Sequence, residues 1–166
     1  MNLKITSIVA AIGFIIISCG QRSTKQEGER SKHSTTITSV EPTNAIIPFF
    51  EANNYFVKNT YKNKEVATLK VISQEEFDEV FGPAAVMGEN GKPTQIDFSK
   101  QYALAVIAPI TDKQTSVTAN SLTYRDTEIV FDYKITEGEP QSFTIQPFLL
   151  IVVDKEHSGQ IKFEKN

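Results

Sequence analysis

The segment from Tyr102 to Ile110 carries no charged side chain and runs Tyr-Ala-Leu-Ala-Val-Ile-Ala-Pro-Ile. Its apolar residues follow one another directly instead of alternating with polar ones. That pattern is typical of a strand buried on both faces, because a half-exposed strand shows polar side chains at every second position. Any fold of this chain therefore has to place Tyr102–Ile110 in its interior.

Several other short segments combine β-branched and aromatic residues with turn-forming neighbours, which predicts further strands. These segments are Asn54–Asn59, Glu65–Ile72, Thr115–Tyr124, Glu128–Ile135, a strand within Ser142–Val153 that is kinked at Pro147, and Gln160–Phe163. Polar turns are expected at Thr111–Thr115, Glu137–Pro140 and Ser158–Gly159, and a loop over Ala84–Gln95. Short connections between consecutive strands favour antiparallel, meander-like pairing.

One helix is predicted, over Ser73–Phe81. Ser73 and Glu76 have the spacing of a capping box, in which the two side chains bind free backbone amides at the start of a helix. An apolar face follows at helical spacing, formed by Phe77, Val80 and Phe81. Gly82-Pro83 is expected to stop the helix. The predicted fold class is α+β: a mainly antiparallel, meander-like β-sheet with one short helix packed on it.

The N-terminus has the features of a bacterial lipoprotein leader. Lys4 precedes an apolar run over Ile8–Ile17, which has the length of a signal-peptide core and is too short to span a bilayer. Ile16-Ile17-Ser18-Cys19 then resembles a lipobox, in which the thiol receives a diacylglyceryl group and the new amino terminus is acylated, for example with palmitate. We expect residues 1–18 to be a signal peptide and Cys19 to anchor the mature protein. The alternatives are an ordinary signal peptide with a chance cysteine and a short membrane anchor.

Residues 19–43 are expected to be a flexible lipidated tether, because Gln21–His33 has no large apolar side chain and buries too little surface to fold. Residues 44–166 then form a single strand-rich domain. The chain is 40% hydrophobic with 11 Phe and 5 Tyr, and packing alone must hold its core because Cys19 is the only cysteine. The formal net charge of −3 argues against nucleic-acid binding, which needs a basic surface.

The domain offers no convincing catalytic constellation, so we predict that it is not an enzyme. Neither a cofactor nor a metal is expected, because the sequence has no histidine pair, cysteine pair or calcium-type loop. His157 is expected in a solvated turn, Asp97 as a cap of turn amides, and the carboxylates of Glu75–Glu79 as solvated charge. A hydrolase is an alternative that would require His157 or Asp97 to lie in a pocket beside a second polar group.

The middle and end of the domain resemble the C-terminal domain of the protease-complex subunit family called PrcB, and also small uncharacterised lipoproteins of Bacteroidetes. The resemblance covers roughly residues 65–155 and includes the Ser73–Phe81 helix, Ile96–Lys100, Ala103–Ile107 and Gln146–Val152. It implies a non-enzymatic role, in which a lipoprotein binds and stabilises a partner protease. The chain departs from that family at Thr111–Thr115, where the PrcB-like turn has glycines and this sequence has none.

These observations predict a lipoprotein of the bacterial cell envelope, anchored through Cys19 in the outer membrane, whose domain binds a protein partner without catalysis. A surface-exposed binder of a small ligand or glycan is the main alternative. The polar segments Gly88–Thr94 and Thr111–Thr115 flank Tyr102–Ile110 and are the candidate contact surfaces, because recognition concentrates on loops carried by a rigid sheet. Their candidate contact residues are Lys92, Thr94, Thr111, Lys113 and Thr115.

Overall fold

The computed structural model describes residues 44–84, 87–88 and 91–166, and the predicted signal peptide and tether lie outside these residues. In the described part the elements follow in the order β1 (Phe50–Glu51), β2 (Tyr55–Val57), β3 (Ala67–Val71), α1 (Gln74–Val80), β4 (Phe81–Pro83), β5 (Gln101–Ile107), β6 (Thr111–Arg125), β7 (Glu128–Ile145), β8 (Phe148–Asp154) and β9 (Gln160–Lys165). Strands dominate and pair mainly antiparallel, with one short helix. The predicted fold class, mainly antiparallel α+β, is confirmed.

A four-stranded antiparallel sheet in the order β1-β8-β5-β3 forms the middle layer of the domain. Its central strand β5 is the predicted interior strand. Tyr102 through Ala108 are all buried, and successive side chains belong to two different apolar clusters on the two faces of the sheet. The prediction of a strand buried on both faces is therefore confirmed for Tyr102–Ala108, whereas Ile110, the last residue of the predicted segment, is 49% exposed.

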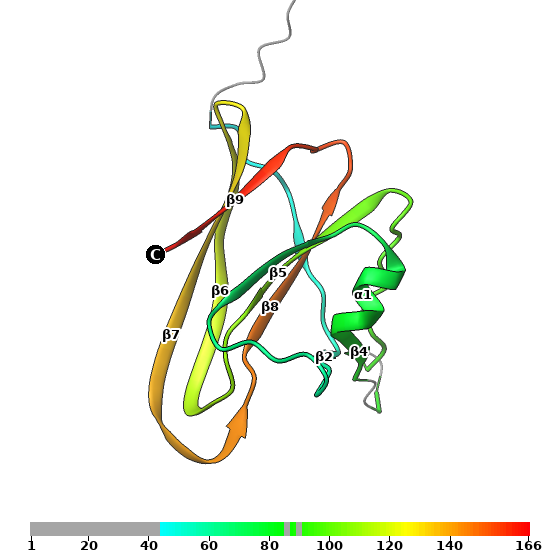
Figure 1. Cartoon of the computed structure of the whole chain (residues 1–166). Helices are drawn as coiled ribbons and strands as arrows, with labels where there is room; N and C mark the ends of the chain where they lie inside the picture. Colours follow the sequence, from blue (N-terminus) through cyan, green and yellow to red (C-terminus); the bar gives the residue numbers. More distant parts are fainter. Residues whose placement is uncertain (1–43, 85–86, 89–90) are drawn as a thin grey trace, which may run out of the picture. The chain divides into compact units, whose positions relative to one another are not determined.

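A second sheet, in the order β6-β7-β9, covers one face of the four-stranded sheet. In the sequence, the long hairpin of β6 and β7 comes between β5 and β8, although these two strands are neighbours in the four-stranded sheet (Figure 1). The last strand β9 pairs with β7 in parallel. The strand order therefore departs from a simple meander, because strands adjacent in the sequence are separated into two sheets.

The core between the two sheets is built from alternate residues of each. Tyr102, Leu104 and Val106 of β5 face Leu122, Ile129 and Phe131 of the second sheet. The segment before β1 closes one side of this core, because Ile47 is fully buried in it. Backbone hydrogen bonds tie the same segment to β6, from Ile47 N to the Leu122 carbonyl and from Asn44 N to the Tyr124 carbonyl, both at 2.8 Å.

The opposite face of the four-stranded sheet is covered by α1, β2 and β4 (Figure 1). The small side chains of Ala103 and Ala105 lie on this face and leave room for the rings of Phe77 and Phe81. The apolar face predicted for the helix thus packs on the sheet, and Phe77 is only 2% exposed. None of the helices in the described part is both long and apolar enough to cross a membrane.

The start of α1 follows the predicted capping pattern with one difference. The Ser73 hydroxyl accepts the Glu76 amide at 3.2 Å, as expected, but the Glu76 carboxylate accepts the Ile72 amide at 2.9 Å instead of the Ser73 amide. The end of the helix differs as well. Phe81 adopts an extended conformation at the C-cap, and Gly82-Pro83 continues into β4, which pairs with β2.

Two predicted turns are wrong. Thr111–Thr115 opens strand β6, and Glu137–Pro140 lies inside β7. The two segments face each other in the hairpin, with Thr115 opposite Glu137 and Lys113 opposite Pro140. Irregular pairing on both sides of Lys113 accommodates a proline that has no amide hydrogen to donate. Pairing across the hairpin therefore outweighs the local preference of these polar residues for turns.

Candidate functional site

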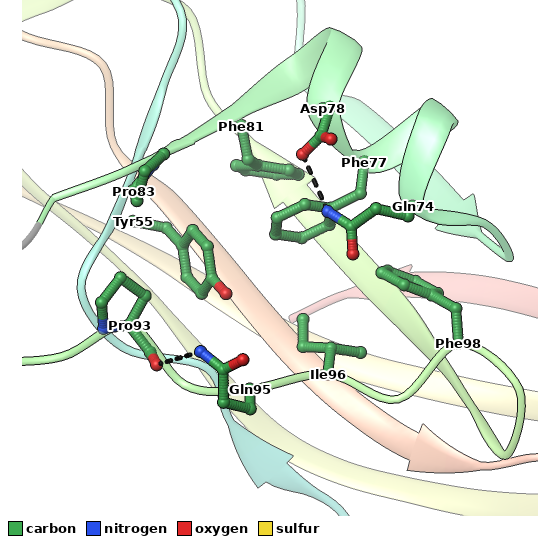
Figure 2. Close-up of a pocket in the computed structure, with 10 residues that line it drawn as sticks. All are labelled: Tyr55, Gln74, Phe77, Asp78, Phe81, Pro83, Pro93, Gln95, Ile96 and Phe98. Atoms are coloured by element: carbon green, nitrogen blue, oxygen red, sulfur yellow. Dashed lines mark hydrogen bonds between the residues drawn. The ribbon is translucent and has the colours of Figure 1, made fainter.

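A hollow of about 230 Å³ lies on the helix-covered side of the domain and is called here the aromatic pocket (Figure 2). It is lined by Tyr55, Gln74, Phe77, Asp78, Phe81, Pro83, Pro93, Gln95, Ile96 and Phe98. These residues come from β2, α1, β4 and the segment that leads into β5. Since α1 runs directly into β4, the pocket exists only because three separate stretches of chain meet there.

The floor and walls of the aromatic pocket are rings in mutual contact. The Tyr55 and Phe77 ring centroids are 5.0 Å apart with planes at 81°, an edge-to-face contact. The Phe77 and Phe98 centroids are 5.6 Å apart. Phe77 is buried in the core, whereas Tyr55 and Phe98 are half-buried. Edge-to-face contacts stabilise such clusters beyond the area they bury, so the walls are held in place by the core.

The polar groups of the aromatic pocket lie at its rim (Figure 2). The Gln74 side-chain amide donates to Asp78 Oδ1 at 2.8 Å, and the Gln95 side-chain amide donates to the Pro93 carbonyl at 3.2 Å. The Tyr55 hydroxyl donates to the Thr94 carbonyl at 2.5 Å. Burial, and secondly the charge of Asp78, raise the pKa of Tyr55. Tyr55 therefore contributes a neutral ring to the pocket wall, and its hydroxyl proton is already donated to Thr94.

The first predicted contact segment borders this pocket, and its backbone is pinned to the residues before β2. Thr94 Oγ1 accepts the Asn53 amide at 2.9 Å, and the Thr94 amide donates to the Asn53 carbonyl at 3.1 Å. The Lys92 carbonyl accepts the Asn54 side-chain amide at 2.9 Å. Thr94 thus positions the pocket wall through its hydrogen bonds, whereas Lys92 is exposed to solvent.

The second predicted contact segment lies in β6, on the other side of the four-stranded sheet. Lys113 and Glu137 form an exposed ion pair across the hairpin at 2.8 Å. Their mutual hydrogen bond raises the pKa of Lys113 and lowers the pKa of Glu137. Thr111 and Thr115 line a hollow of about 250 Å³ together with Ile110. The structure therefore keeps the two predicted contact segments apart.

Ile110 also borders a further hollow of about 290 Å³, called here the open-end groove. Its lining contains no charged side chain: Phe56, Val57, Asn59, Ile110, Thr144, Ile145, Gln146 and Phe148. Phe56 is 45% exposed, Ile110 49%, and Phe143, two residues before the lining Ile145, 59%. From the sequence, Phe56, Phe143 and Phe148 are candidates for an aromatic binding surface, but core packing is the favoured role for most aromatic residues, because nothing in the local pattern distinguishes an exposed Phe from a buried one.

His157 and Asp97, the two residues considered for catalysis, both make contacts that support the local structure. The half-buried His157 places Nδ1 3.4 Å from the Tyr124 hydroxyl and Nε2 3.5 Å from Glu156, so it is less exposed than predicted. Asp97 accepts the Ser99 amide at 3.0 Å and the Ser99 hydroxyl at 2.5 Å, and these bonds lower its pKa. Asp97 therefore caps a turn, as predicted.

The helix carboxylates Glu75, Glu76, Asp78 and Glu79 are all exposed, as expected for solvated charge, and Asp78 also lines the aromatic pocket. No local pattern indicates this second role, since the pocket wall opposite Asp78 is built by distant segments. Within residues 44–84, 87–88 and 91–166, no group of three or more His, Cys, Asp or Glu side chains is arranged to hold a metal ion.

No family model, no curated protein and no solved structure matches this chain.

Proposed function

We propose that this chain is a lipoprotein of the cell envelope, anchored through Cys19, whose domain binds another protein without catalysing a reaction. The observation that carries the binding role is the open-end groove, where Phe56, Ile110 and the neighbouring Phe143 are exposed around an uncharged lining. Apolar side chains gathered on the surface of a soluble domain mark contact sites for other proteins or membranes.

The position of the groove favours a protein over the membrane as its occupant. The described chain begins at Asn44, which is bonded to Tyr124 close to the end of the hairpin that joins β6 to β7. Ile110 and Ile145 stand at the other end of the same hairpin (Figure 1). The groove therefore lies at the end of the domain away from the point where the tether joins it.

The anchor is tested by labelling growing cells with a fatty-acid analogue. We expect the wild type and a Ser18→Ala control, which keeps a small residue before the cysteine, to be labelled, and Cys19→Ser to stay unlabelled. Equal labelling of all three proteins would contradict the lipoprotein assignment.

The binding role is tested by crosslinking before detergent extraction, which should recover a protein partner together with the wild-type protein. Recovery of the wild-type protein without any partner would contradict the binding role.

The resemblance to PrcB suggests that the partner is a protease and that binding stabilises it. This part of the proposal predicts that deletion of the lipoprotein lowers the abundance of the recovered protease. A recovered partner with no protease activity would limit the proposal to protein binding.

A second candidate function, binding of a small ligand or glycan, is favoured by the aromatic pocket. Half-buried Tyr55 and Phe98 offer ring surfaces of the kind that stack on a ligand. However, the volume of about 230 Å³ is below the roughly 300–1,000 Å³ of ordinary small-molecule sites. A single ring or one amino-acid side chain is therefore the largest occupant that this pocket accommodates.

A further inference from the structure

We propose that the aromatic pocket binds one basic side chain, an arginine or lysine, that a partner protein presents to it. The inference rests on the proposed protein-binding function and adds the chemistry of the side chain that is recognised. It combines three observations on the described residues: aromatic walls, a carboxylate without an ionic partner, and a volume that suits one side chain.

The walls supply the first part of the recognition. Tyr55 and Phe98 are half-buried around the pocket, and the buried Phe77 ring lies between them in contact with both. Aromatic faces attract cations through the electron density of the ring, and arginine stacks on them most often. A long basic side chain also has an apolar stem that can lie along such rings while its charged end reaches the rim.

The carboxylate supplies the second part. Asp78 Oδ1 accepts the Gln74 amide, and among the described residues no ion pair includes the Asp78 carboxylate. The Lys58 ammonium binds the Asp78 backbone carbonyl instead of the side chain. A guanidinium or ammonium in the pocket would find an acceptor there, and such charge-assisted hydrogen bonds are about twice as strong as neutral ones.

The alternatives to a basic side chain fit less well. A purely apolar side chain would cover Asp78 and remove water from its carboxylate without replacing the lost hydrogen bonds. An acidic side chain would meet the charge of Asp78 and of the neighbouring Glu75 and Glu79, and the Lys58 ammonium on the Asp78 backbone carbonyl offsets these three charges only in part. The pocket therefore selects a cation over a neutral or acidic group of similar size.

The test measures the binding of capped tripeptides to the lipidated full-length protein in detergent, by the shifts of its aromatic NMR signals. The probes are Gly-Arg-Gly and Gly-Lys-Gly, with Gly-citrulline-Gly and Gly-Phe-Gly as uncharged comparisons. We expect the basic peptides to shift the Tyr55 signal, which a Tyr55→Phe spectrum identifies. Citrulline has nearly the shape of arginine without its charge, so binding of the citrulline peptide as tight as that of the arginine peptide would overturn the proposal.

Two variants separate the pocket carboxylate from the general charge of the helix. Asp78→Asn should weaken arginine-peptide binding roughly tenfold or more, because it removes the charge from the acceptor. Glu79→Gln makes the same change one residue further on the helix, outside the pocket lining, and should keep binding within about twofold. Equal binding by both variants, at equal melting temperatures, would overturn the assignment to the pocket.

Recovery of the crosslinked partner distinguishes this inference from the proposed function. Asp78→Asn should lower partner recovery and Glu79→Gln should not. If the partner is recovered equally with both variants, protein binding stands and the pocket inference fails. If the wild type recovers no partner, the proposed function fails, together with the claim that a partner presents the side chain, whereas the peptide measurements still decide what the pocket prefers.

Discussion

Tyr102 places a hydroxyl group inside the core between the two sheets. The residue is almost fully buried, its hydroxyl donates to the His157 carbonyl at 2.8 Å, and the Lys70 ammonium lies 4.9 Å from its ring centroid. Burial, and secondly the proximity of Tyr124, raise the pKa of Tyr102 from 10.0 to about 12. The hydrogen bond to His157 connects the β8–β9 turn to the core, so the protonation of one phenol affects how that turn is held.

The raised pKa of Tyr102 predicts a loss of stability at high pH. The phenol loses its proton near pH 10 in the unfolded chain and only near pH 12 in the folded domain, so deprotonation favours the unfolded state. The stability that the neutral phenol provides is complete below pH 10 and is lost as the pH rises towards 12.

Denaturant unfolding of the wild type and Tyr102→Phe, measured across that pH range, checks this expectation. The free energy of unfolding should fall more steeply with pH for the wild type. The variant also loses the hydrogen bond to His157, which lowers its stability at every pH and leaves the difference in slope as the readout. Parallel curves for the two proteins would contradict the assignment to Tyr102.

At the scale of single elements, Phe77 is the larger of the two side chains, with Val80, that α1 buries. Phe77 contacts the rings of Tyr55, Phe81 and Phe98 at centroid distances of 5.0, 5.0 and 5.6 Å. Phe77→Ala should lower the free energy of unfolding by about 3–5 kcal/mol, because a buried ring is replaced by a cavity. Chemical denaturation measures this loss, with the exposed Glu79→Ala on the same helix as a control that should unfold like the wild type. A loss below 1 kcal/mol would show that the helix is not held by this contact.

The elements also show which parts of the fold could be predicted from the sequence. The helix start at Ser73 and the interior strand around Leu104 were predictable, because capping is decided within four residues and a doubly buried strand shows no polar alternation. The strand character of Thr111–Thr115 and of Glu137–Pro140 was not. Each is polar and mostly exposed, and its strand structure depends on pairing with a segment more than twenty residues away.

At the scale of the whole molecule, the candidate sites are products of the tertiary arrangement. The aromatic pocket needs Tyr55, Asp78 and Phe98 from three segments, and the open-end groove needs Phe56 beside Ile110. Local patterns contain no information about such neighbours, so sequence reasoning found Lys92 and Thr94 beside the pocket without finding the pocket. Thr111 and Thr115 were candidates because they belong to a polar segment beside the interior strand, whereas Phe143 was a possible surface residue that the sequence could not separate from core aromatic residues.

The partner surface is predicted to be the end of the domain that carries the open-end groove. Ile110→Ser should reduce recovery of the crosslinked partner at a nearly unchanged melting temperature, because Ile110 lines the groove and is about half exposed. Ile72→Ser is the matched control: Ile72 is a similarly exposed apolar residue outside the groove lining. Equal recovery with both variants would place the contact elsewhere on the domain.

Charge reversal then decides whether the polar residues beside the groove take part. Lys113→Glu should also reduce recovery, and since exposed ion pairs add little stability, the loss of its pairing with Glu137 should leave the fold intact. Adding Glu137→Lys restores the ion pair in reverse. If Lys113 itself touches the partner, the double variant still fails to recover it; full recovery by the double variant would show that only the ion pair matters. Lys92→Glu, on the aromatic-pocket side of the sheet, applies the same measurement to the other polar segment. Unchanged recovery there together with loss at Lys113 would show that Lys113, and not Lys92, takes part in the contact.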